Sequence, residues 1–161
     1  MTRTISTLLL AVLLFLSSDA LARNTILQLK VADVVNNPAY ASQLAGVNFY
    51  FGDTPHPAPV NTFGEYRTNK KTNAFNKSDT EACEWAMLSA LLTLHKRAVS
   101  LGANAVVNIR SNYKNNLVRS DTEYTCGAGA IMAGVALIGD FVKIPDDAVK
   151  TAPAAATESS E

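Results

Sequence analysis

A single long helix is the feature that most constrains how this chain can fold. Ser78 and Glu81 fit a capping box, in which the serine side chain accepts a hydrogen bond from the third amide and the glutamate reaches back. Gly102 supplies the left-handed residue that commonly ends a helix. The sequence therefore predicts a helix over residues 78–101.

The apolar residues of this helix fall into two stripes. A helix that covers one face of a sheet needs only one apolar stripe. The second must be covered by the N-terminal segments of the chain or by another subunit, so a homo-oligomer remains open as a prediction. The main stripe is Cys83, Met87, Ala90, Leu91, Leu94, Ala98 and Leu101, and the second is Trp85, Leu88, Leu92 and Val99.

The rest of the chain is typical of strands separated by turns. Three prolines within residues 53–59 predict a loop, and the polar residues 68–77 predict a surface loop. Residues 32–44 indicate a short helix or two turns, interrupted near Pro38. We expect an α+β fold, with one long amphipathic helix packed on a mostly antiparallel sheet. The predicted strands span residues 25–31, 47–51, 63–67, 103–110 and 122–126, with a further extended stretch over 141–144.

Composition limits both size and function. The 161 residues are enough for one small domain, and an apolar fraction of 48% is enough for a core. Lys and Arg number 14, and so do Asp and Glu. This balance excludes a strongly basic nucleic-acid-binding protein.

The N-terminal segment predicts export. Arg3 is followed by the apolar run LLLAVLLFL at residues 8–16, and then by the cleavage pattern Ala20-Leu21-Ala22. The alternative, a transmembrane anchor, needs about 20 apolar residues. We expect a signal peptide over residues 1–22, cleaved near Ala22, and a periplasmic or secreted mature protein. Its domain is expected over residues 23–144, followed by a disordered acidic tail over 145–161.

The two cysteines favour a disulfide. Cys83 lies on the main stripe of the helix, and Cys126 ends a predicted strand that should pack on it. Exported proteins fold in an oxidising compartment, where such pairs form. The bond would close a loop of about 44 residues and stabilise the fold by roughly 4 kcal/mol. The alternative is two free buried thiols.

The sequence assigns no catalytic, cofactor-binding or metal-binding residue. His95 lies twelve residues beyond Cys83 on the same helix, or about 18 Å, so the two cannot form a nucleophilic pair. His56 lies in the proline-rich loop, where a site with a carboxylate and a loop group stays open. Gly127, Gly129 and Gly134 miss the dinucleotide fingerprint and indicate close approach of a neighbouring element.

The strongest local charge bias lies in residues 63–77. Four bases stand against Glu65, and aromatic residues are interleaved with them. This pattern is compatible with a loop that binds a polyanion or an acidic lipid surface, or with a solvated loop. The four bases are Arg67, Lys70, Lys71 and Lys77.

The C-terminal half resembles a known family. A motif between the long helix and a glycine-rich hydrophobic strand resembles the YbjQ-like family, also described as heavy-metal-binding domains. It runs from Ala98 through Leu101-Gly102-Ala103-Asn104-Ala105 to Ile109. The resemblance covers residues 82–144 and implies a compact α/β domain that forms ring-like oligomers in some members. It brings no established catalytic residues.

The mature chain also resembles small exported proteobacterial proteins with the same FGEY, TNKKTNAFNKSD and AGAIMAGVAL stretches, which are often labelled excinuclease ATPase subunits. The chain has neither a P-loop nor a four-cysteine zinc set, so its residues do not predict that activity.

The functional prediction is a non-enzymatic binding or interaction module of the cell envelope, with no cofactor, no specific nucleic-acid partner and no transmembrane segment. A metal-binding periplasmic protein is the alternative. A hydrolytic enzyme with no recognisable motif is the third hypothesis.

Overall fold

A computed structural model of the protein describes residues 23–149. The predicted signal peptide and residues 150–161 of the predicted tail lie outside the described residues. No helix within residues 23–149 is both long enough and apolar enough to cross a bilayer.

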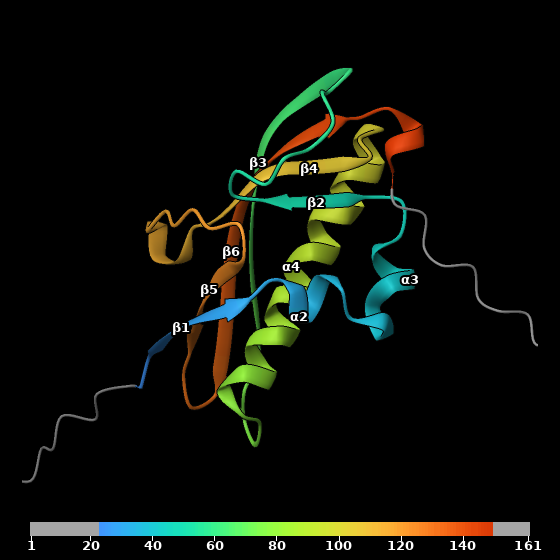
Figure 1. The fold of residues 1–161 in the computed structure, drawn as a ribbon. Helices are drawn as coiled ribbons and strands as arrows, with labels where there is room; N and C mark the ends of the chain where they lie inside the picture. Colours follow the sequence, from blue (N-terminus) through green and yellow to red (C-terminus); the bar gives the residue numbers. More distant parts are fainter. Residues whose placement is uncertain (1–22, 150–161) are drawn as a thin grey trace, which may run out of the picture.

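Six strands form one curled sheet, and the long helix packs on one of its faces (Figure 1). The strand order is β1-β5-β6-β4-β2, and β3 pairs with β6 outside this path. All pairs are antiparallel except β2 with β4, which confirms the predicted α+β class. The strands are β1 (Thr25–Lys30), β2 (Asn48–Phe51), β3 (Asn61–Asn73), β4 (Ala105–Ser111), β5 (Glu123–Ala128) and β6 (Met132–Lys143).

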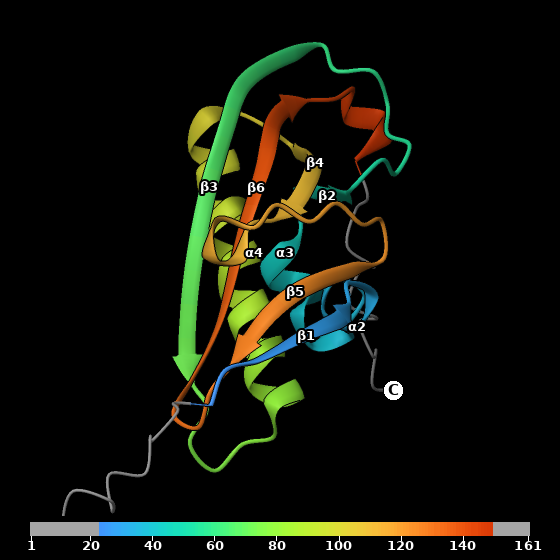
Figure 2. The same ribbon diagram turned by 90° about the vertical axis from the view of Figure 1, so that its left-hand side faces the viewer.

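Strand β6 organises the sheet. One of its edges pairs with β3 along almost its whole length, and Figure 2 shows the two strands side by side. Its other edge is shared, because residues 133–135 pair with β5 and residues 137–142 pair with β4. A bulge in β4 at Asn108, which has a φ of 51°, shifts the register between β4 and β6. The two partner strands can therefore diverge, and the sheet curls around the helix.

Helix α4 (Asp79–Leu101) has the predicted ends. The Ser78 hydroxyl accepts a hydrogen bond from the Glu81 amide at 3.1 Å. Gly102 adopts the left-handed conformation, with a φ of 76°, and closes the helix on the carbonyls of Ala98 and Val99. Six residues of the main predicted stripe are fully or almost fully buried, namely Cys83, Met87, Ala90, Leu91, Leu94 and Ala98.

The N-terminal segments cover part of the second stripe. They comprise α2 (Ala32–Val35), the 3₁₀ turn η1 (Pro38–Tyr40) and α3 (Ala41–Leu44). Leu88 is buried, so it belongs to the monomer core rather than to a free surface. Leu92 is partly buried, whereas Trp85 and Val99 are exposed. Of the four residues predicted to form an oligomer surface, only Trp85 and Val99 are therefore exposed. Self-association stays a prediction.

A disulfide joins Cys83 to Cys126, as the sequence favoured. Both residues are fully buried, and their Cα atoms lie 5.9 Å apart. The bond fixes the first turns of α4 to β5, which pairs with β1.

The structure corrects two predicted boundaries. Residues 68–73 belong to β3 rather than to a surface loop, because their backbones pair with residues 132–137 of β6. The folded part also extends to at least Val149. The 3₁₀ turn η3 (Asp146–Ala148) follows β6, and Ala148 and Val149 pack on a small second core formed by β4 and the end of β6.

Candidate binding groove

The four predicted bases are divided between the two sides of β3. Thr72 donates a hydrogen bond from its hydroxyl to the Ala82 carbonyl of α4 at 2.9 Å, so alternate residues such as Lys70 lie on the helix side. Arg67 and Lys71 therefore lie on the outer face, away from α4. Lys77 lies beyond the strand, in the turn that leads to α4. The bases do not form the single loop that the sequence predicted.

Two paired glycines make a flat floor on the outer face. Gly127 of β5 lies opposite Gly134 of β6. A Cβ atom on Gly127 would overlap the ring of Tyr113, and a Cβ atom on Gly134 would lie 3.7 Å from that ring and 3.4 Å from Cγ of Lys71. The Tyr113 ring and the stem of Lys71 therefore stand side by side over a surface that side chains elsewhere in a sheet would fill.

A backbone turn and a side-chain hydrogen bond hold Tyr113 over this floor. It begins the 3₁₀ turn η2 (Tyr113–Asn115), in which Lys114 and Asn115 both have positive φ. Its hydroxyl donates a hydrogen bond to Oδ1 of Asn24 at 3.0 Å, which connects the turn to the start of β1.

These residues border a groove of about 760 Å³, which we call the tip groove. It lies at the end of the sheet where β5 turns into β6, the lower end in Figure 2. Its walls combine apolar surface with two cations, Arg23 and Lys71. The lining residues are Arg23, Asn24, Lys71, Tyr113, Gly127, Gly129, Ala130, Ile131, Met132, Ala133 and Gly134.

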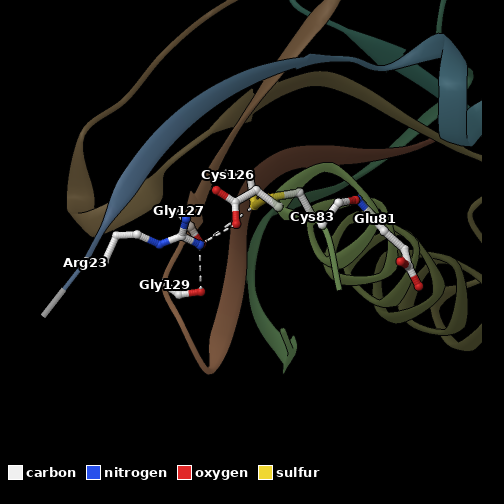
Figure 3. Close-up of polar contacts among 8 residues, drawn as sticks. Arg23, Glu81, Cys83, Cys126, Gly127 and Gly129 are labelled. Carbon is white, nitrogen blue, oxygen red and sulfur yellow. Dashed lines mark hydrogen bonds and ion pairs between the residues drawn. A yellow bond between two sulfur atoms is a disulfide. The ribbon is translucent and has the colours of Figure 1, made fainter. Parts of the chain in front are cut away.

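The two cations differ in their surroundings. Arg23 forms an ion pair with Asp79 at 2.5 Å. It also donates a hydrogen bond to the Gly129 carbonyl at 3.4 Å (Figure 3). Among residues 23–149, no carboxylate lies within ion-pair distance of Lys71. Lys71 is thus the cation of the tip groove that is free to meet an anionic ligand.

The histidines lie elsewhere and apart from each other. The His95 ring nitrogen Nε2 lies 2.8 Å from the Ala45 carbonyl, so this histidine connects α4 to the end of α3. His56 borders a polar hollow of about 500 Å³ with Asp53 and Arg119, which form an ion pair with each other at 2.5 Å. Within the described residues, no three His, Cys, Asp or Glu side chains gather as metal ligands would.

Among residues 23–149, Tyr124 is the one core group whose pKa is strongly shifted. Burial raises the pKa of its phenol above the ordinary range, and the negative charges of Glu84 and Asp33 raise it further. Its hydroxyl has no protein hydrogen-bond partner among the described residues. It faces α4 and α2 rather than the tip groove, so it belongs to the stability of the fold.

The sequence predicted that Gly127, Gly129 and Gly134 approach a neighbouring element closely, but it did not predict the groove. Tyr113 was missed because nothing in its local sequence shows that its ring covers two strands that follow it in the chain.

Comparisons with protein-family models, with curated proteins and with solved structures gave no match.

Proposed function

We propose that this protein is an exported, non-enzymatic binding module of the cell envelope and that the tip groove binds an amphipathic anion. The observation that carries the proposal is the position of Lys71, a cation without a carboxylate partner among the described residues, beside the Tyr113 ring that rests on Gly127. Apolar surface from Ile131 and Met132 belongs to the same groove.

The chemistry of the groove supports this class of ligand. A lysine ammonium attracts a phosphate or carboxylate as a point charge, and the methylene stem beneath it remains apolar. The Tyr113 ring and the side chains of Ile131 and Met132 give the groove apolar surface that an alkyl chain can contact. The ligand therefore needs a negative headgroup and a hydrocarbon part, which distinguishes it from inorganic phosphate.

The predicted location belongs to the same proposal. The disulfide between Cys83 and Cys126 is compatible with an oxidising compartment. The cleavage pattern near Ala22 supports a periplasmic or secreted mature chain. We also propose that residues 82–144 form a YbjQ-like domain, supported by the long helix followed by the Gly-Ala-Asn-Ala turn into a strand.

The test is calorimetric titration of the mature protein with dodecyl phosphate, below the concentration at which it forms micelles. We expect saturable binding that Lys71→Gln weakens about tenfold, since a charge-assisted hydrogen bond contributes about 1.5 kcal/mol or more. Arg67→Gln is the matched control, because Arg67 lies on the same strand and face but outside the groove. Equal losses in the two variants, or no binding by the native chain, would overturn the proposal.

A further inference from the structure

Three large apolar side chains protrude at the end of the molecule that carries the tip groove. Phe75 is 61% exposed, Ile131 is 68% exposed and Met132 is 50% exposed. We call these three residues the apolar tip. They gather because Asn73 pairs with Met132 and the Ala74 amide donates a hydrogen bond to the Ile131 carbonyl at 2.7 Å.

The apolar tip projects at the edge of the tip groove, to whose lining Ile131 and Met132 also belong. Ile131 and Met132 stand at the turn between β5 and β6, and Phe75 stands in the connection from β3 to α4; both segments lie at the extreme lower end of Figure 2. Turns at the surface ordinarily carry polar residues, since water must solvate them. A projecting apolar cluster of this kind indicates a contact surface.

Two lysines flank the apolar tip. Lys71 pairs with Gly134, two residues along the ladder from the pair of Asn73 and Met132. Lys77 follows Phe75 by two residues, in a turn closed by a hydrogen bond from the Lys77 amide to the Ala74 carbonyl at 3.2 Å. The first acid after Lys77 in the chain is Asp79, and Arg23 already forms an ion pair with it. Glu81 lies two residues further along α4.

The N-terminus adds to this charge. Cleavage after Ala22 would leave the α-ammonium group on Arg23, whose side chain contacts the turn of the apolar tip at the Gly129 carbonyl. Before cleavage, only six residues separate this residue from the apolar run at residues 8–16. The end of the domain nearest to the export membrane is therefore the end that carries the apolar tip.

We propose that the apolar tip docks on the surface of a bilayer that contains anionic phospholipid. Phe75, Ile131 and Met132 enter the interfacial layer, while Lys71 and Lys77 meet the phosphate groups beside them. A protein partner would ordinarily need a complementary, broader surface, whereas a small apolar projection with cationic flanks fits a soft anionic interface. This inference rests on the proposed function, because it makes the phospholipid the source of the amphipathic anion.

The test is flotation of the mature, disulfide-bonded protein with vesicles of phosphatidylethanolamine and phosphatidylglycerol, compared with vesicles of phosphatidylcholine alone. We expect binding to the anionic vesicles that salt weakens. Changing Phe75→Ser and Ile131→Ser together should lower the bound fraction at least tenfold. Val60→Ser is the matched control, since Val60 is as exposed as Ile131, at 68%, but precedes β3 at the opposite end of that strand.

A second measurement does not depend on how well these variants fold. In a Trp85→Phe background, Ile131→Trp should show a blue-shifted emission on anionic vesicles and quenching by brominated acyl chains, whereas Val60→Trp should show neither. Failure of the native protein to float, or equal effects at Ile131 and Val60, would overturn this inference.

The outcomes also separate the two proposals. Binding of dodecyl phosphate without vesicle binding would retain the proposed function and reject bilayer docking. Vesicle binding that depends on the apolar tip but not on Lys71, together with no binding of dodecyl phosphate, would retain docking and reject the groove.

Discussion

Tyr124 illustrates how one buried hydroxyl can work against the fold that surrounds it. Its phenol is almost fully buried and has no protein partner within the described residues. An unsatisfied buried hydroxyl costs about 1–3 kcal/mol. We expect Tyr124→Phe to raise the free energy of unfolding at neutral pH by about 1 kcal/mol. Tyr113→Phe, which removes a hydroxyl bonded to Asn24, should lower it by a similar amount. Urea unfolding measures both, and a loss of stability in Tyr124→Phe would contradict the prediction.

The raised pKa of Tyr124 also predicts a pH dependence. In the unfolded chain the phenol loses its proton near pH 10, whereas the folded protein retains it to higher pH. Above pH 10 the folded state therefore binds more protons than the unfolded state, and stability falls as pH rises. Tyr124→Phe should remove this part of the alkaline loss, as urea unfolding below and above pH 10 would show. An unchanged pH dependence in the variant would contradict the assignment.

Gly127 tests whether Tyr113 truly rests on the glycine floor. A methyl group at position 127 would overlap the Tyr113 ring, so Gly127→Ala must displace the ring or strain the strand. Overpacking of this kind costs about 1–3 kcal/mol. In the double variant Gly127→Ala with Tyr113→Ala, most of this extra cost should disappear, because no ring remains to be displaced. Additive losses in the double-mutant cycle would show that the two residues do not interact.

At the scale of elements, α4 and its disulfide were accessible from sequence, whereas the extent of β3 was not. Ser78 and Gly102 mark the ends of α4 by local rules that hold in any context. Residues 68–73 read as a loop because they are polar, yet they form a strand because the long edge of β6 offers them hydrogen bonds. Lysines on such an edge strand discourage pairing with other chains.

The sheet order could not be predicted from the chain either. In this order, β4 and β5 both pair with the same edge of β6. Local sequence does not indicate which half of that edge each strand occupies. The tip groove was beyond sequence reasoning for the same reason, since Lys71, Tyr113 and Gly127 come from three separate elements.

The disulfide is the element-scale feature with the largest expected effect. Cys83 and Cys126 are 43 positions apart, so loop closure in the unfolded chain predicts about 4 kcal/mol of stabilisation. Replacing both cysteines with alanine should lower the free energy of unfolding by about this amount. Because both sulfurs are buried, reductant alone should leave the bond intact until the protein unfolds. Rapid alkylation of reduced thiols in the native protein would contradict this expectation.

At the scale of the whole molecule, the length of β6 separates the charged groups near its start from those that follow its end. It has 12 residues and so spans about 40 Å. The β5–β6 turn stands at its start, and the chain passes through η3 at its end. The C-terminal segment after β6 carries four acids against one base, namely Asp146, Asp147, Glu158 and Glu161 against Lys150. The described part of this segment, residues 144–149, therefore follows the end of β6 remote from Lys71, which pairs with Gly134 near the start of that strand.

The length of β6 consequently gives the protein an electrical polarity that its zero net charge conceals. Lys71 pairs near the start of β6 and Asp146 and Asp147 follow its end, so a negatively charged surface attracts the β5–β6 turn more than the opposite end. Approach to such a surface would be oriented from the start, with the β5–β6 turn leading and Val149 facing away.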